Sequence, residues 1–219
     1  MQAKQGAIRA FWLAAGLFLT GLGIIGLALP VMPGTIAALP DDVAVDAAFG
    51  GRIDIVIDTT LHIRPGGLLD RATTVGAREE MERVYFGPLR LAQALGPVLR
   101  ARAGEGSHAA CAWVSLLSIA GLVPQPGYRL NAAAHAAALS LVHTLRAELR
   151  PLKIIAALVG PLDDDWHQTL PPPKVTPGQL AAAVLRGLTA GLEDLTVGDI
   201  ARDVLDRWTD HPAITLRQP

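Results

Sequence analysis

Short apolar runs alternate with longer helical patterns from about residue 50 to the end of the chain. The apolar runs lie at 53–57, 110–117, 153–159 and 194–197. Buried parallel strands are typically near-continuous hydrophobic runs, and their alternation with helices indicates βαβ units. We therefore predict an α/β fold, with an open parallel sheet, right-handed crossovers and helices on both faces.

Helical patterns separate these runs. One extends from Ala77 to Arg102, and an Ala-rich pattern covers 128–149. The broad stripe of small residues on the second suits packing on the sheet, and it equally suits a homodimer or a protein partner. A third helix is expected to begin at Thr176 as N-cap, with Pro177 at its first position.

Residues 10–29 form an apolar run without a charged residue. About twenty residues at ~1.5 Å each span the ~30 Å core of a bilayer. Lys4 and Arg9 precede the run, which predicts a single membrane-spanning helix with a cytoplasmic N-terminus. We expect a hydrophobic segment at 1–36, a folded domain at 37–219, and a location at the bacterial inner membrane. The side on which the domain lies stays open, because the charge bias places it outside whereas a nucleotide-binding enzyme belongs inside.

The same run contains a competing pattern. Gly21, Gly23 and Gly26 fit the G-x-G-x-x-G spacing of a dinucleotide loop. That loop needs a strand before it and a helix after it, and the prolines at 30 and 33 would stop such a helix. We favour the membrane helix and keep the nucleotide loop as the alternative.

The net charge and the cysteine content limit the partners and sites that we expect for this chain. The formal net charge of −1 gives no electrostatic reason to expect a nucleic-acid partner. The single cysteine, Cys111, excludes an intrachain disulfide, and we interpret it as a small buried hydrophobe. Three aspartates at 163–165 and His167 offer hard ligands, but we favour a solvated loop there and predict no metal site.

The residues Ser118-Ile119-Ala120-Gly121 and the Ala-rich helix after them resemble the catalytic strand and helix of the short-chain dehydrogenase/reductase (SDR) family. The resemblance covers about residues 36–209 and implies a Rossmann-like sheet. In this register the family's catalytic Ser is Ser118, its Tyr falls at Asn131 and its Lys at His135. The family's structural Asn falls at Val84, so one of the four catalytic positions is retained.

The replacements alter the expected chemistry. In the family, the Tyr exchanges a proton with the carbonyl or alcohol, and the Lys lowers the pKa of that Tyr. Asn131 has no titrating proton, and His135 is a shorter and weaker substitute for Lys. Tyr128 lies one helical turn too early to take the place of the missing Tyr.

The resemblance also implies cofactor contacts. Asp42 stands where the family contacts the adenine ring, Asp58 begins the segment in place of Asn-Asn-Ala-Gly, and Asp164 stands where a Thr meets the nicotinamide. The family's first half, which holds the glycine loop, has no counterpart before Asp42, so we expect an N-terminally truncated domain. NAD(P) binding is therefore a weak expectation, through Gly21, Gly23, Gly26, Asp42 and Asp58.

Residues 21–35 resemble the opening of the YbaN-type small bacterial inner-membrane proteins, a family of unknown function. A fused gene would produce this junction with an SDR-like domain. Three functional hypotheses follow: a non-catalytic SDR-like scaffold or accessory subunit anchored in a membrane, an NAD(P)-dependent oxidoreductase with a divergent site, and a fusion product without activity. The lost proton relay favours the first.

Overall fold

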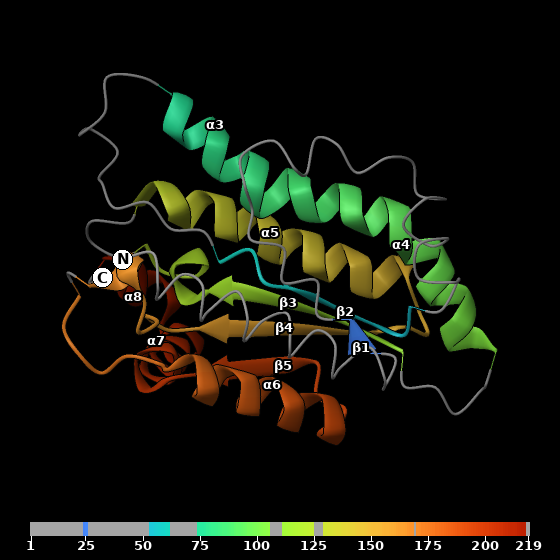
Figure 1. The fold of residues 1–219 in the computed structure, drawn as a ribbon. Coiled ribbons are helices and arrows are strands. Elements are labelled where there is room, and N and C mark those ends of the chain that lie inside the picture. The colour runs from blue at the N-terminus through green and yellow to red at the C-terminus, as the bar shows by residue number, and fades with distance from the viewer. Residues whose placement is uncertain are drawn as a thin grey trace, which may run out of the picture.

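A computed structural model describes residues 24–25, 53–61, 74–105, 111–124, 129–168 and 170–217. Its strands form one parallel sheet in the order β1-β2-β3-β4-β5 (Figure 1). The strands are β1 (Ile24–Ile25), β2 (Ile55–Asp58), β3 (Ala112–Ser118), β4 (Lys153–Val159) and β5 (Asp194–Val197). The predicted Rossmann-like parallel sheet is confirmed, and β4 and β5 begin and end at the predicted residues.

Strands β3 and β4 form the centre of this sheet. They pair in register from Ala112↔Lys153 to Ser118↔Val159. Every residue of β3 is buried, as is every residue of β4 after Lys153. Burial on both faces explains why these strands are continuous apolar runs in the sequence and not alternating ones.

Helices cover both faces of the sheet. The described helices are α3 (Val75–Met81), the π-helical turn η2 (Glu82–Phe86), α4 (Gly87–Gly104), the 3₁₀ turn η3 (Ile119–Gly121), α5 (Arg129–Glu148), the 3₁₀ turn η4 (Asp165–His167), α6 (Pro177–Ala190), α7 (Asp199–Asp210) and α8 (Pro212–Arg217). One core joins α4, α5 and α7 to a face of the sheet and includes Trp113, Leu99 and Val142. The other core joins α6 to the opposite face and includes Ile155 and Val184.

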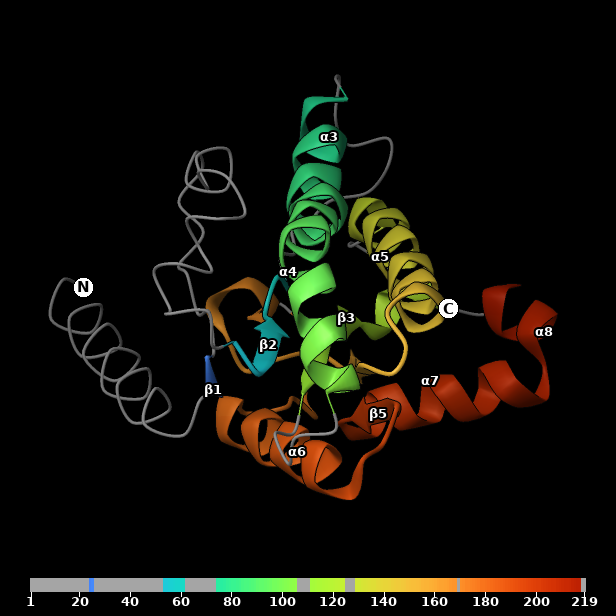
Figure 2. The same ribbon diagram turned by 90° about the vertical axis from the view of Figure 1, so that its right-hand side faces the viewer.

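The crossovers between neighbouring strands do not all have the same hand. The strand order advances in one direction, yet α4 and α5 lie on one face of the sheet and α6 lies on the other (Figure 2). The crossovers through α3–α4 and through α5 are right-handed, so the β4-α6-β5 crossover is left-handed. The prediction of right-handed connections throughout is wrong at α6, because α6 buries its apolar stripe on the face that α5 leaves open.

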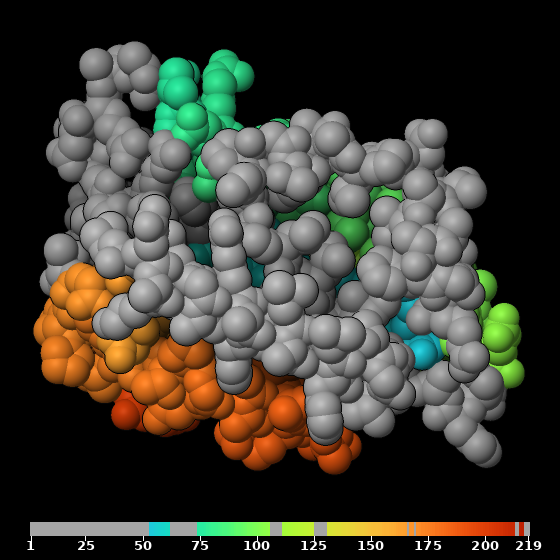
Figure 3. Space-filling view, in the orientation of Figure 1, coloured from blue at the N-terminus to red at the C-terminus, as the bar shows by residue number. Residues whose placement is uncertain are grey.

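The helix predicted from Ala77 to Arg102 is present but interrupted. A continuous helical segment runs from Val75 to Gly104, with the π-helical turn η2 in its middle. Helix α6 begins as predicted, since the Thr176 side chain accepts from the backbone N–H of Gln179 in a capping box. This helix lies at the molecular surface (orange in Figure 3).

The N-terminal segment contributes a strand where a membrane helix was predicted. Ile24 and Ile25 pair in parallel with Ile55 and Val56 of β2. A continuous helix over 10–29 is therefore wrong at these two residues, because an apolar run of this kind suits a buried strand as well as a helix. The rest of 10–29 lies outside the described residues. Within the described part of the chain, no helix combines the length and the apolar character that crossing a bilayer requires.

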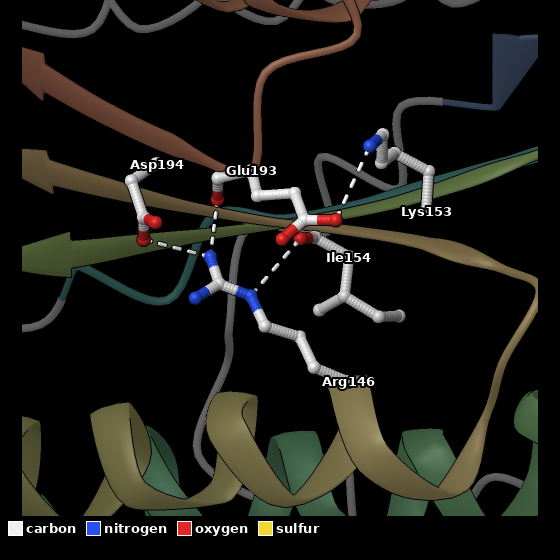
Figure 4. A network of polar contacts seen from close by, with 5 residues as sticks. All are labelled: Arg146, Lys153, Ile154, Glu193 and Asp194. Carbon is white, nitrogen blue, oxygen red and sulfur yellow. Dashed lines mark hydrogen bonds and ion pairs between the residues drawn. The ribbon is translucent and has the colours of Figure 1, made fainter.

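Arg146 ties the end of α5 to the sheet (Figure 4). Its Nε donates to the carbonyl of Ile154 over 3.2 Å, and its Nη2 reaches Asp194 Oδ1 at 2.8 Å and also the carbonyl of Glu193. Lys153 Nζ lies 3.2 Å from Glu193 Oε1. These contacts fix where β4 and β5 start relative to α5, and so help to align the carboxyl ends of both strands.

Candidate functional site

Ser118 ends β3 at the carboxyl edge of the sheet. Its Oγ accepts from the backbone N–H of Ala120 at 3.2 Å, and this bond caps η3. The side chain is buried and stands opposite Val159, the last residue of β4. In open α/β sheets ligands bind outside the carboxyl ends of the strands, which is where Ser118 lies.

His135 on α5 lies directly behind Ser118. The backbone N–H of Ser118 donates to Nδ1 of His135 over 3.2 Å. A ring nitrogen that accepts a hydrogen bond carries no proton, so His135 is the neutral tautomer with its proton on Nε2. His135 is 0% exposed and therefore lies inside the fold. His143, on the same helix, is exposed.

Gly121 allows this close packing. A Cβ at Gly121 would lie 2.9 Å from the carbonyl carbon of His135 and 3.1 Å from the backbone nitrogen of Ala136. These are backbone atoms that a side-chain rotation cannot move. A glycine in η3 therefore lets the backbone of α5 approach the end of β3.

Asn131 faces a buried carboxyl group. Its Nδ2 donates to Oε2 of Glu80 over 3.5 Å, and the two residues are 0% and 1% exposed. Sequence reasoning missed Glu80. The available signal was its spacing, because Gly76, Glu80 and Val84 follow one another at four-residue intervals on the buried face of the same helical segment.

Val84 occupies the π-helical turn η2 and is buried. Turns of this type occur often at functional sites. The turn stands at the position assigned to the family's structural Asn, and η2 packs against α5. The π-helical turn is therefore present at the position where the family carries its structural Asn and this chain carries Val84.

Asp58 ends β2 on the same edge. Burial raises the pKa of its carboxyl group, and hydrogen bonds from the side chain and backbone of Thr60 act in the opposite direction. Thr60 Oγ1 lies 2.6 Å and Thr60 N lies 3.1 Å from Asp58 Oδ1. The carboxyl group thus accepts both hydrogen bonds from a residue only two positions further along the chain.

Asp164 and His167 bind each other in the segment after β4. Asp164 Oδ1 accepts from the backbone N–H of His167 at 2.9 Å and lies 2.6 Å from its Nδ1. His167 is buried, so the predicted solvated loop is wrong for that residue, whereas Asp163 and Asp165 are exposed. Asp164 therefore positions the imidazole of His167.

Cys111 precedes β3 and is half-buried. Burial and the nearby Asp54 raise the pKa of its thiol. The expected small hydrophobe is therefore only partly enclosed, and its thiol is held in the protonated form.

Five predicted site residues lie outside the described residues. These are Tyr128, Gly21, Gly23, Gly26 and Asp42. Strand β1 bears on the three glycines, because Ile24–Ile25 fall inside the G-x-G-x-x-G spacing. A dinucleotide loop requires the strand to precede the motif, and the nucleotide-loop interpretation of these glycines stays a prediction.

The described site is a buried polar cluster, made of Ser118, His135, Asn131 and Glu80. It offers a hydroxyl, a neutral imidazole, an amide and a carboxyl group. None of them is a phenol activated by a neighbouring ammonium, which is the arrangement that an acid/base Tyr requires. Proton transfer here would have to use different groups.

No family model matches the chain. A solved short-chain dehydrogenase from Burkholderia cenocepacia J2315, in complex with NADP, superposes with a TM-score of 0.70 at 30% identity, over 80% of this chain and 72% of that chain. The chain belongs to the short-chain dehydrogenase/reductase family. The resemblance carried by the Ser118 motif is thereby confirmed, whereas the N-terminal truncation and the likeness of 1–36 to YbaN-type proteins stay predictions.

Further relatives agree with this SDR assignment. The 3-ketodihydrosphingosine reductase of Dictyostelium discoideum is 33% identical over 116 residues, which are 53% of this chain and 33% of that protein. The chain thus matches about a third of the length of that curated relative. A short-chain dehydrogenase from Sphingobium yanoikuyae, in complex with NADPH, has a TM-score of 0.64 at 22% identity over 82% of this chain and 70% of that chain, and it shows the shared fold.

Proposed function

We propose that this SDR-family chain is an NAD(P)(H)-dependent oxidoreductase that acts on a carbonyl or alcohol. The observation that carries the proposal is Ser118, which ends β3 at the ligand-binding edge of the sheet with the neutral His135 behind it. The Burkholderia relative was solved with NADP, and the Dictyostelium relative is named a reductase. These relatives support the choice of cofactor and reaction class.

The described residues partly fit a nicotinamide cofactor, which would supply the hydride. Strands β2, β3 and β4 end side by side and offer the edge along which it would lie. Asp58 would meet it at the end of β2, and the raised pKa of that carboxyl group reduces its repulsion of an anionic ligand. Gly21, Gly23 and Gly26, where phosphate contacts are expected, lie outside the described residues.

Proton supply would be the weak part of this site. The Ser118 hydroxyl can donate a hydrogen bond to a substrate oxygen, but it is far less acidic than an activated phenol. A positioned general acid contributes about 10²–10⁴-fold to a rate. We therefore expect turnover slower by about that factor than with an activated Tyr.

Asn131 favours a second candidate function. It replaces the acid/base Tyr, and both it and His135 are fully buried. In that case the chain would be a non-catalytic SDR-like scaffold or accessory subunit. Attachment to the bacterial inner membrane through 10–29 stays a prediction, as does a homodimer or partner contact through 128–149. Pelleting with membranes tests the attachment.

Equilibrium binding of NADPH and NADH, followed by fluorescence on the full chain in mild detergent, tests the proposed function. Binding tighter than about 100 μM, or ~5.5 kcal/mol, together with oxidation of NADPH on a panel of ketones, is the expected result. Ser118→Ala should keep the cofactor affinity and lose the oxidation. Binding without turnover would favour the non-catalytic candidate, and no binding at millimolar cofactor would contradict the oxidoreductase.

A further inference from the structure

A pocket of about 220 Å³ lies at the carboxyl edge of β4 and β5, on the side of α6. Its walls come from the segment that follows β4, from α6, and from the turn between β5 and α7. They include no residue of β3, α3 or α5, so the pocket is separate from the Ser118–His135 site. A single water needs only about 10–15 Å³ of such volume, so the pocket has room for a small organic molecule or one end of a larger one.

Each wall carries a basic side chain into the lining. Lys174 comes from the segment before α6, Arg186 from α6 and Arg202 from α7. One carboxylate, Asp199, lies among them and forms an ion pair with Arg202. Lys174 and Arg186 have no ion-pair partner among the described residues, so the lining has an excess of positive charge.

The position of Lys174 is fixed by the backbone of its neighbour. Val175 N–H donates to the carbonyl of Pro161 at 2.8 Å, and Asp163 N–H donates to the carbonyl of Val175 at 2.9 Å. The capping box at Thr176 then starts α6 without a gap. Lys174 is thus held at the pocket by the two backbone bonds of Val175 and by the start of α6, which both directly follow it.

Helix α6 presents one face to the pocket. The lining contains Gln179, Ala183 and Arg186, which are spaced four and three residues apart and therefore share a helix face. Ala183 leaves space between the two longer side chains. The spacing brings Arg186 to the same cavity as Lys174.

The turn into α7 adds backbone donors. Gly198 is the N-cap of α7, so no side chain caps the first amide groups of the helix. Its φ of 97° and the 2.5 Å that would separate a Cβ from Val175 Cγ2 both require glycine here. Gly198, Asp199 and Ile200 line the pocket, so the positive end of the α7 dipole lies at the same cavity as the cations.

We propose that this pocket binds the anionic group, phosphate or carboxylate, of a small molecule. Lys174 and Arg186 supply charge, and the first turn of α7 supplies N–H donors. The Asp199 carboxylate repels the anionic group and so lowers the affinity of the pocket for it. The lining shares no residue with the Ser118–His135 site, but Gly160 and Pro161 directly follow β4, whose end belongs to the edge proposed for the cofactor.

Titration of the full chain with inorganic phosphate and, separately, with acetate tests the proposal. Backbone amide shifts of Gly198–Ile200 would be followed by NMR, with chloride at equal ionic strength as the reference. Saturable shifts with phosphate alone assign a phosphate site, and shifts with both anions assign a general anion site. Absence of saturable shifts with either anion would overturn the proposal.

Charge variants of the pocket give the decisive comparison. Lys174→Gln with Arg186→Gln should weaken anion binding by about tenfold or more, since the unpaired cations are removed. Arg90→Gln with Lys153→Gln removes the same charge at residues paired with Glu82 and Glu193 outside the pocket, and should leave the affinity unchanged. Equal losses in the two double variants would mean non-specific attraction and would overturn the site.

Asp199→Asn should change the anion affinity in the opposite direction. Removing this carboxylate should tighten anion binding at the pocket, because repulsion is lost and Arg202 is released from its ion pair. A misfolded variant would not bind more tightly, so this result separates charge from stability. Unchanged or weaker binding by Asp199→Asn would contradict the placement of the ligand beside α7.

Discussion

The backbone N–H of Ser118 donates to Nδ1 of His135 over 3.2 Å in a fully buried setting. This bond joins the end of β3 to α5 through the two positions where the family carries its Ser and its Lys. His135 directs the lone pair of its Nδ1 onto the backbone of the strand. The histidine therefore acts here as a link between elements in addition to any contact with a ligand.

The first prediction concerns this link. His135→Ala leaves the buried N–H of Ser118 without its acceptor and opens a cavity, so we expect a loss of about 2–4 kcal/mol in the free energy of unfolding. His143→Ala, at an exposed position of the same helix, should change it by less than about 0.5 kcal/mol. Urea denaturation of both variants gives the comparison, and equal effects would mean that the Ser118 contact contributes nothing.

Asp58 leads to a prediction about pH. Burial raises the pKa of this carboxyl group in the folded chain. The folded state therefore holds this proton more tightly than the unfolded state does, and the bound proton stabilises the fold. That contribution is complete below the unfolded pKa of about 4 and is lost as the pH rises through the folded pKa. Asp58→Asn removes this titration and keeps an acceptor for Thr60.

The variant should be more stable than the parent at neutral pH, and the difference should shrink as the pH falls toward about 4. Thermal unfolding between these limits measures it. Asp163→Asn, at an exposed position, controls for the loss of one negative charge. A difference in stability that grows as the pH falls would mean that folding lowers the pKa of Asp58 and does not raise it.

The sequence predicted the sheet well where strands are buried on both faces. The apolar runs gave β4 and β5 with their observed ends, and the Ser118 motif gave the register that brings residues 118 and 135 together. Strand β1 was missed because Ile24–Ile25 lie inside a longer apolar run, whose pattern does not separate strand from helix. The left-handed crossover was missed because the face that α6 covers is decided by packing and not by its own sequence.

The polar side of the site was less predictable. A charged residue is expected to be exposed, so Glu80 was overlooked, yet it lies in the buried stripe with Val84. The burial of His135 has the same origin, since an imidazole in an Ala-rich helix gives no sign of which face packs. The match between Asn131 and Glu80 depends on how α3 docks against α5, which is a tertiary property.

Arg146 is the subject of the third prediction. Arg146→Ala removes bonds to the carbonyls of Ile154 and Glu193 and to the Asp194 carboxylate, so we expect a loss of about 1–3 kcal/mol in the free energy of unfolding. Asp194→Asn should cost less than about 1 kcal/mol, because that carboxylate is largely exposed and the carbonyl bonds remain. Chemical denaturation separates the two. A larger loss with Asp194→Asn would show that the ion pair, and not the bonds to the strands, carries the stabilisation.

Two glycines supply the last prediction, since they differ in what a methyl group would meet. Gly121→Ala places a Cβ 2.9 Å from the backbone of His135, so α5 must move away from β3 and the Ser118–His135 bond must lengthen. We expect a loss of about 1–3 kcal/mol in stability. Gly178→Ala, in the first turn of α6, meets nothing within 4 Å and should stabilise by up to about 1 kcal/mol. Thermal unfolding gives both signs, and NMR of the Ser118 amide reports the bond itself. Loss of stability with an unchanged Ser118 amide shift would mean that the strain is absorbed elsewhere and that the contact between η3 and α5 does not hold the site in place.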